Sequence, residues 1–153
     1  MQLFSGMRNK EILNLKADDL KVDEDSGVLY FFVKGSKTAN TTRRIPVHKY
    51  LIERSVVDYI KSNNGSNTSS AAISMIFTKL LKKLEINNIN AQGHLLSFYS
   101  LRHNFMTVLV GSGATDTMIN SIVGHAQEGA KNAYINAMQI DLQALDNVIQ
   151  KVS

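Results

Sequence analysis

Residues 97–105 of this chain read SFYSLRHNF, and the rest of the sequence is best interpreted outward from them. Ser100 is expected to cap a helix that turns Phe105 and Leu109 inward, so Arg102 would lie in the first turn of that helix. Free backbone N–H groups at a helix start favour an anion, and a guanidinium group adds two parallel donors. The stretch therefore predicts that Arg102 belongs to a phosphate-sized anion site.

A second part of this site is expected towards the C-terminus, where residues 123–125 read VGH. Thr115 is expected to cap a short helix, and Gly124 suits the left-handed residue that ends it, which delivers His125 at the helix exit. Tyr134 follows nine residues later. A tyrosine hydroxyl has a pKa of about 10, so it needs nearby positive charge to act as a nucleophile near neutral pH.

A third part is expected near the N-terminus, where residues 6–12 read GMRNKEI. The apolar spacing predicts a helix over residues 7–15, entered through residues 5–6, with Arg8 near its start. Phosphoryl transfer needs positive donors around the phosphate oxygens, and guanidinium groups stay charged and bind such oxygens bidentately. Arg8 and Arg102 are therefore expected to clamp one phosphate.

Between these segments the sequence predicts a small antiparallel sheet of three strands, at residues 20–22, 28–33 and 43–47. Helices are expected at residues 49–60, 73–84, 100–110, 115–123, 127–136 and 142–152. The helix over residues 73–84 has the clearest apolar stripe, and its burial should contribute about 10 kcal/mol before entropy is counted. The predicted class is α+β, mostly helical, with one three-stranded sheet near the N-terminus.

Composition narrows the function without deciding it. The chain has 153 residues, enough for one domain, and 17 Lys and Arg against 13 Asp and Glu give a net charge of +4 that favours a polyanionic partner. The sequence contains no Cys, and its four His residues form no H-x-x-x-H pair, so we expect no metal. No apolar run of membrane-spanning length is present, and a cytoplasmic location is the default expectation.

These segments, in this order and spacing, resemble the catalytic domain of the tyrosine recombinases, the phage-integrase family. The resemblance makes Gly6-x-Arg8-x-x-Glu11 the first arginine box, and residues 124–125 a later box. It makes Tyr134 the nucleophile, which would form a 3′-phosphotyrosine link to DNA without a metal or nucleotide cofactor. It also implies a general-acid lysine in the hairpin between the second and third strands, where Lys37 fits best and Lys34 is the alternative.

One residue departs from the family pattern. The second box is usually His-x-x-Arg, and here it reads Tyr99-x-x-Arg102. A tyrosine at this position can donate a hydrogen bond to phosphate, but it accepts protons poorly near pH 7. The spacing of His94 to Arg102 is wrong for a substitute. His103 is expected to give structural support, and His48 is expected to be solvated.

The resemblance implies duplex DNA as partner and a tetramer on DNA when the protein is full length. Lys34, Arg43 and Arg44, at the two ends of the hairpin, are assigned to DNA contact. Full-length relatives carry an N-terminal core-binding domain, which is expected to be absent from residues 1–153, as in a truncated form or a gene remnant. The C-terminal segment, residues 137–153, would dock either on a neighbouring protomer or back on its own chain.

Two alternatives remain open at this point. The first is a DNA-binding remnant that keeps the fold without activity, which the departure at Tyr99 motivates. The second is a helical interaction domain whose basic residues bind a protein or RNA. Taken singly, Arg8 could form a surface ion pair with Glu11, Arg102 could cap a neighbouring helix or pair with a carboxylate, and His125 could sit at a helix C-terminus. It predicts no particular cost when Arg8 or Arg102 is removed from a protein tested on DNA.

Overall fold

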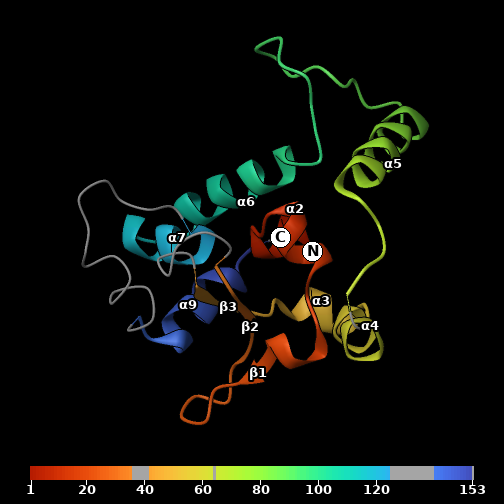
Figure 1. The fold of residues 1–153 in the computed structure, drawn as a ribbon. Helices are drawn as coiled ribbons and strands as arrows, with labels where there is room; N and C mark the ends of the chain where they lie inside the picture. Colours follow the sequence, from red (N-terminus) through yellow and green to blue (C-terminus); the bar gives the residue numbers. More distant parts are fainter. Residues whose placement is uncertain (36–41, 64, 125–139, 153) are drawn as a thin grey trace.

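A three-stranded antiparallel sheet lies in the lower half of Figure 1, below α2, α6 and α7, in this computed structural model, which describes residues 1–35, 42–63, 65–124 and 140–152. The strands are β1 (Leu20–Val22), β2 (Leu29–Val33) and β3 (Arg43–Pro46), in the order β1-β2-β3. All three lie where the β-prone runs predict them. Pro46 lies on an edge strand, opposite Tyr30, where its missing N–H group is tolerated.

Helices surround the sheet. They are α1 (Gln2–Ser5), α2 (Asn9–Leu13), the 3-10 turn η1 (Ala17–Asp19), α3 (Lys49–Glu53), α4 (Val56–Ser62), α5 (Ser70–Lys83), α6 (Ser100–Gly111), α7 (Asp116–Val123) and α9 (Leu142–Ile149). The predicted α+β class is therefore confirmed. The helix expected over residues 127–136 lies outside the described residues. No helix in the described part of the chain is both long and apolar enough to cross a membrane.

The caps of α6 and α7 place the site segments. Thr115 caps α7, with its hydroxyl accepting from the backbone N–H of Met118 at 3.3 Å, and Gly124 ends α7 at a φ of 71°, both as predicted. The expected cap of α6 was wrong, because Tyr99 is the N-cap and Ser100 is the first helical residue. The Ser100 hydroxyl instead accepts from the backbone N–H of Ser97 at 3.1 Å. Arg102 still lies in the first turn of α6.

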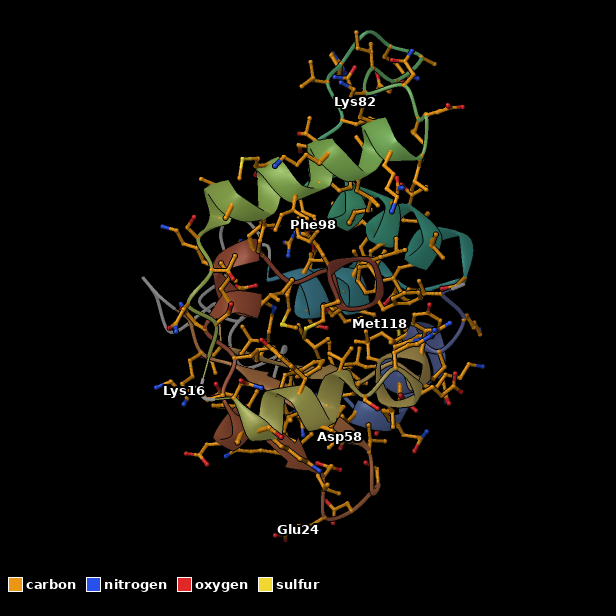
Figure 2. All side chains as sticks on the ribbon, turned by 90° about the vertical axis from the view of Figure 1, so that its right-hand side faces the viewer. Lys16, Glu24, Asp58, Lys82, Phe98 and Met118 are labelled. Atoms are coloured by element: carbon orange, nitrogen blue, oxygen red, sulfur yellow. The ribbon has the colours of Figure 1, made fainter. Side chains whose placement is uncertain are left out.

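The core fills the space between the sheet and helices α6, α7 and α9, as the side chains in Figure 2 show. Its most buried apolar members are Met7, Phe31, Ile45, Phe105, Leu109, Ile122 and Ile149. The apolar stripe of α9 is buried within this chain, where α9 packs on β3. Gln150 ties the end of α9 to the start of α3, with its side chain donating to the carbonyl of Val47 at 3.1 Å and accepting from the backbone N–H of Lys49 at 2.9 Å.

The helix expected over residues 49–60 is two helices. Ser55 adopts a left-handed conformation, with a φ of 54°, and separates α3 from α4. Leu51, Val57 and Ile60 are buried, whereas Ile52 and Tyr59, which would share an apolar stripe with Ile60 on one continuous helix, are exposed. The break rotates α4 relative to α3, so a stripe read across one continuous helix was wrong here.

Helix α5 forms where predicted, but its apolar stripe is not buried. Of the stripe residues only Leu81 is buried, while Ile76, Leu80 and Leu84 are 59%, 46% and 56% exposed. The helix lies at the right-hand edge of Figure 1, away from the sheet, and Phe77 meets the ring of Phe98 edge-on at 5.7 Å. The stabilisation of about 10 kcal/mol expected from its burial is therefore not realised in this fold.

His48 was also placed wrongly by the sequence, because it is buried and not solvated. It is the N-cap of α3, where Nδ1 accepts from the backbone N–H of Tyr50 at 3.1 Å. Its ring lies 4.8 Å from the ring of Phe4.

Candidate phosphate-binding site

Arg8 opens the site from the N-cap of α2, with its side chain 38% exposed. Glu11, three residues on, receives the backbone N–H of Arg8 at 2.7 Å and its Nη1 at 3.0 Å. The first contact is one half of a capping box, so the helix start itself directs the Glu11 carboxylate at Arg8. The Arg8–Glu11 ion pair is thus present, and the remaining guanidinium donors of Arg8 point elsewhere.

Arg102 lies beneath Arg8 and is fully buried. Its Nη1 donates to the carbonyl of Gly6, and its Nη2 donates to the carbonyl of Val123 at 2.7 Å. Among the described residues its Nε has no hydrogen-bond partner. Burial lowers the pKa of the Arg102 guanidinium below its ordinary value, and the positive charge of Arg8 adds to this effect. Arginine nonetheless stays protonated at any physiological pH.

Arg43, on β3, completes the cluster from the sheet side. Its Nη1 and Nη2 donate to Glu11 at 3.0 and 2.8 Å, and its Nε donates to the carbonyl of Ile122 at 2.7 Å. The side chain is 1% exposed. The assignment of Arg43 to DNA contact is therefore wrong for this structure, because its guanidinium is enclosed by protein groups. The sequence placed Glu11 in the first arginine box and near Arg8, but it did not reveal the contact between Glu11 and Arg43.

The three arginines converge on three successive carbonyl groups at the end of α7. Arg43 binds that of Ile122, Arg102 that of Val123, and Arg8 that of Gly124, the last through Nη2 at 3.0 Å. The last carbonyls of a helix lack intrahelical partners and carry the negative end of the helix dipole, so they attract guanidinium groups. The predicted proximity of Arg8 and Arg102 is therefore present, directly before residue 125.

Burial alone would raise the pKa of the Glu11 carboxyl. The hydrogen bond and charge of Arg43, together with those of Arg8, outweigh burial and bring this pKa below its ordinary value. The carboxylate is consequently ionised near neutral pH. Three guanidinium groups and one carboxylate leave the cluster with an excess of positive charge, which suits an anionic ligand.

Tyr99 stands beside this cluster. It is 39% exposed, and its ring centroid lies 6.0 Å from the guanidinium carbon of Arg102. The ring of His103 meets it edge-on at 5.2 Å, in keeping with a supporting role for that histidine. His94 lies in an exposed turn, where its backbone N–H binds the side chain of Asn90 at 2.8 Å. Lys37, His125 and Tyr134 lie outside the described residues.

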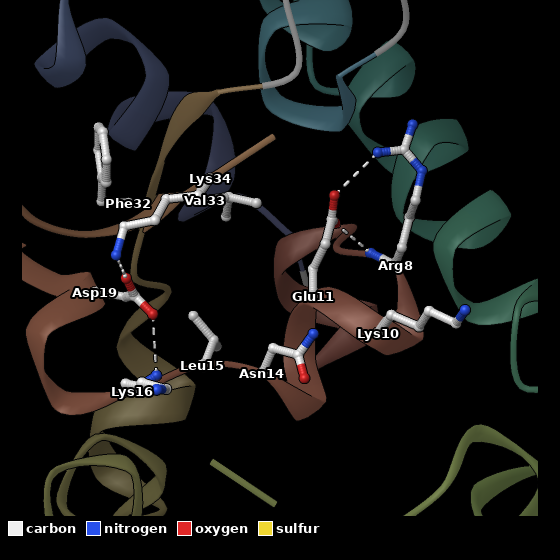
Figure 3. A pocket seen from close by; sticks show the side chains of 10 residues that line it. All are labelled: Arg8, Lys10, Glu11, Asn14, Leu15, Lys16, Asp19, Phe32, Val33 and Lys34. Atoms are coloured by element: carbon white, nitrogen blue, oxygen red, sulfur yellow. Dashed lines mark hydrogen bonds and ion pairs between the residues drawn. The ribbon is translucent and has the colours of Figure 1, made fainter. Parts of the chain in front are cut away.

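A pocket of about 560 Å³ adjoins the cluster between α2, η1 and β2 (Figure 3). Arg8 and Glu11 form one side of it. At the other side Lys34 pairs with Asp19 at 2.9 Å, so its Nζ points away from Arg8 in Figure 3. The remaining charged lining residues are Lys10 and Lys16. The pocket is therefore rimmed mainly by cations.

Arg44 follows Arg43 on β3 and takes a different partner. Its Nη1 pairs with Asp23 at 3.2 Å, and its Nη2 donates to the carbonyl of Ile140 at 3.1 Å.

In the described part of the chain no three side chains of the types that bind metals gather closely enough to hold an ion.

Residues 1–139 match the phage integrase family, and the chain belongs to this family. A curated relative is the tyrosine recombinase XerA of Thermococcus kodakarensis, which is 28% identical over 85% of this chain and 46% of its own length. The tyrosine recombinase XerH of Campylobacter jejuni is 22% identical over 99% of this chain and 43% of its own length. The chain therefore spans about half the length of the curated relatives it matches.

The fold agrees with solved structures of the same family. The integrase from mycobacterium phage Brujita superposes with a TM-score of 0.69 at 17% identity, over 99% of this chain and 48% of that one. The XerH site-specific recombinase, bound to its palindromic difH substrate in a post-cleavage complex, superposes with a TM-score of 0.63 at 20% identity. That match covers 94% of this chain and 41% of the XerH chain.

Proposed function

We propose that this chain carries the catalytic part of a site-specific DNA recombinase that cuts and rejoins strands through a 3′-phosphotyrosine intermediate. The observation that supports this most directly is the convergence of Arg8 and Arg102 on the carbonyls of Val123 and Gly124, directly before His125. Family membership supports the same activity.

In the proposed reaction the Tyr134 oxygen attacks the scissile phosphorus and gives up its hydroxyl proton to solvent, while the bond to the 5′-oxygen of the next nucleotide breaks and that oxygen leaves with a proton. Arg8 is the half-exposed donor to the phosphate, and Arg102 adds positive charge directly behind it. Tyr99 donates a hydrogen bond, and His125 assists. Lys37 protonates the leaving oxygen, with Lys34 as the alternative.

The proposed partner is duplex DNA, and the assembly on DNA is a tetramer of the full-length protein acting in the cytoplasm. The cation-rimmed pocket beside Arg8 supports contact with a polyanion. The related XerH is bound to a DNA substrate in its solved structure. No metal or nucleotide cofactor enters the proposed reaction.

The test is covalent trapping on nicked duplex DNA, in which the short leaving strand diffuses away and the protein–DNA adduct accumulates. A pool of nicked duplexes of random sequence supplies the target, because the recognition sequence is not read from this chain. We expect a denaturant-resistant adduct that Tyr134→Phe abolishes. Tyr59→Phe, which removes the hydroxyl of an exposed tyrosine on α4, is the matched control and should leave the adduct intact. An adduct that survives Tyr134→Phe contradicts the proposal.

A DNA-binding remnant without activity is the second candidate. It is favoured by Tyr99 standing where the family has a histidine, and by the complete burial of Arg102. This candidate predicts salt-sensitive DNA binding with no adduct under any trapping condition. A helical interaction domain instead predicts that Arg8→Ala and Arg102→Ala leave DNA binding unchanged.

A further inference from the structure

We propose that Arg43 is a positioning residue, which fixes the orientation of Arg8 through Glu11 and anchors the end of α7 from which residue 125 departs. The inference rests on the proposed function, because Arg8 is placed there as the donor to the phosphate. Nothing in the family resemblance assigns this role to Arg43, and the sequence suggested a DNA contact instead.

The three nitrogens of the Arg43 guanidinium are all engaged, and they join two parts of the site. Two nitrogens hold Glu11 on α2, and the third holds the Ile122 carbonyl on α7. The planar fork of arginine makes this possible, because its donors lie at fixed angles to one another. A lysine ammonium at the same place would be a single point charge and would not reproduce both contacts.

Glu11 transmits the position of Arg43 to Arg8 because each of its oxygens serves both arginines. Oε1 accepts from Nη1 of Arg8 and from Nη1 of Arg43, both at 3.0 Å. Oε2 accepts from the backbone N–H of Arg8 at 2.7 Å and from Nη2 of Arg43 at 2.8 Å. Without Arg43, Arg8 alone would balance the negative charge of this part-buried carboxylate. Arg8 would then be drawn towards Glu11 and would offer less charge to a phosphate.

Gly124 supplies a second line of argument. A Cβ atom at this glycine would lie 3.0 Å from Nη1, 3.1 Å from Cζ and 3.2 Å from Cδ of Arg43. The guanidinium therefore rests against the bare backbone of the turn that ends α7. Arg8 donates to the carbonyl of this same glycine, so Arg8 and Arg43 both contact the turn that ends α7.

Stability alone does not explain an ionic cluster here. Taking an arginine and a glutamate out of water costs several kcal/mol per ion, and well-packed apolar residues often replace such pairs without loss of stability. Positioning of Arg8 is a role that apolar residues would not perform. A purely structural role and the proposed role therefore predict different rates of adduct formation for variants of equal stability.

The experiment compares five variants of this chain with the parent protein. They are Arg43→Met, Arg43→Lys, Glu11→Gln, the double variant Arg43→Met with Glu11→Gln, and Arg54→Met. Arg54 is an exposed arginine at the end of α3 that stacks on Tyr50 at 5.1 Å, so its replacement is the matched control for losing one guanidinium. Urea unfolding checks that each variant is folded.

Two readouts are measured on the folded variants. The first, for the parent protein and the variants that keep Glu11, is the pKa of the Glu11 carboxyl, followed by carbon NMR on labelled glutamate, which needs no activity. The second readout combines two measurements on a nicked substrate that traps the adduct. These are the affinity for DNA and the single-turnover rate of adduct formation. A merely structural role would also raise the Glu11 pKa, because the charge of Arg43 is lost in either case, but it would not slow adduct formation at unchanged DNA affinity.

We expect Arg43→Met to raise the Glu11 pKa and to slow adduct formation by about tenfold or more, because a small misplacement of a catalytic group costs that much. DNA affinity should change by less than about twofold, since Arg43 itself does not touch DNA. Arg43→Lys keeps the charge but not the planar fork, so it should slow adduct formation like Arg43→Met while raising the Glu11 pKa less. Adding Glu11→Gln to Arg43→Met should restore part of the rate, because it removes the charge that captures Arg8. Arg54→Met should match the parent protein.

The proposal is overturned if Arg43→Met leaves the Glu11 pKa unchanged, or if the double variant loses the sum of the two single losses. It is also overturned if rate and affinity fall together. Should Arg43→Met fail to fold, the comparison of rate with affinity is made on Arg43→Lys, which keeps the charge and nearly the volume but not the planar fork, and a fall of both together overturns the proposal. If the parent protein forms no adduct at all, the proposed function fails, while the Glu11 titration still decides whether Arg43 controls that carboxylate.

Discussion

At the scale of single residues, Gly124 serves both the backbone and the site. Its φ of 71° suits glycine, and the guanidinium of Arg43 occupies the space of a side chain. We expect Gly124→Ala to destabilise the protein by about 1–2 kcal/mol, because alanine in the left-handed region is strained and its methyl group would displace Arg43. Urea unfolding monitored by circular dichroism measures this change.

Gly111 is the matched control for that substitution. It lies in the last turn of α6, and a Cβ added there would meet nothing within 4 Å. Gly111→Ala should be neutral, or stabilising by up to about 1 kcal/mol, since alanine has the better helix propensity. Equal destabilisation at both positions would show that the turn after α7 imposes no special demand.

His48 predicts a pH dependence of stability. Burial lowers its pKa below the ordinary value, although hydrogen bonds to the backbone oppose this in part. Below about pH 6.5 the unfolded chain therefore binds a proton that the folded chain does not, and the free energy of unfolding should fall as the pH drops. The slope should approach, and not exceed, about 1.4 kcal/mol per pH unit.

The measurement is urea unfolding between pH 7.5 and 5.5, carried out on the parent protein and on His48→Asn, with this range set around the ordinary pKa of histidine at about 6.5. Asparagine is a good N-cap, so it keeps an acceptor for the N–H group of Tyr50 while it removes the titration. The variant should lose most of the pH dependence. An unchanged slope would mean that another group titrates in this range. Glu11 does not contribute to the pH dependence in this range, because its lowered pKa places its titration at more acidic pH.

Residue spacing predicted the local part of the site and missed the distant part. Arg8 and Glu11 are three residues apart, so a helix start brings them together and the motif reveals it. Arg43 and Glu11 are 32 residues apart, and they meet only because β3 passes behind α2 in the folded chain. The prediction for His48 was wrong for a similar reason, since the ring and the helix end that enclose this residue come from separate segments of the chain.

At the scale of elements, α5 and α9 show what periodicity can and cannot establish. Both carry an apolar stripe at helical spacing, and both form helices where predicted. The stripe of α9 is buried against β3, whereas most of the stripe of α5 remains exposed. Periodicity identifies the face that would be buried, but the packing partner belongs to the tertiary fold.

This contrast predicts different costs for one chemical change. Leu145→Ala, in α9, should destabilise the protein by about 2–5 kcal/mol, because it removes fully buried methyl groups and leaves a cavity. Leu80→Ala, on the exposed face of α5, should stay within about 0.5 kcal/mol of the parent protein. Urea midpoints at constant m-value measure both. A large loss at Leu80 would mean that the face of α5 is covered in solution.

At the scale of the whole molecule, the excess of positive charge predicts how the proposed binding to DNA depends on salt. Affinity for duplex DNA should fall linearly with salt on logarithmic axes, since each neutralised phosphate releases counterions. Arg8→Ala should lower the magnitude of this slope by about 0.9, the value for one phosphate contact. Fluorescence anisotropy over a salt series measures it.

Arg54→Ala removes the same charge from an exposed position at the end of α3 and serves as the comparison. Its slope should equal that of the parent protein. Equal slopes for the parent protein and Arg8→Ala would show that Arg8 does not contact DNA.

The class of the fold could be read from the sequence, because three short β-prone runs and several helical stripes are local patterns that a sheet and helices must satisfy. The break between α3 and α4 was not visible, because Ser55 takes a left-handed conformation that its residue type does not signal. The three arginines on the last carbonyls of α7 also depended on tertiary packing, which no window of sequence contains.

The position of α9 has a consequence for synthesis on the ribosome. Helix α9 covers β3, and Gln150 binds both Val47 and Lys49, more than a hundred residues earlier in the chain. A nascent polypeptide therefore leaves β3 partly uncovered until residues 142–152 have cleared the exit tunnel. The arginine cluster on α2, β3 and α6 rests on this same core, so it gains its full support only after α9 has emerged and packed on β3.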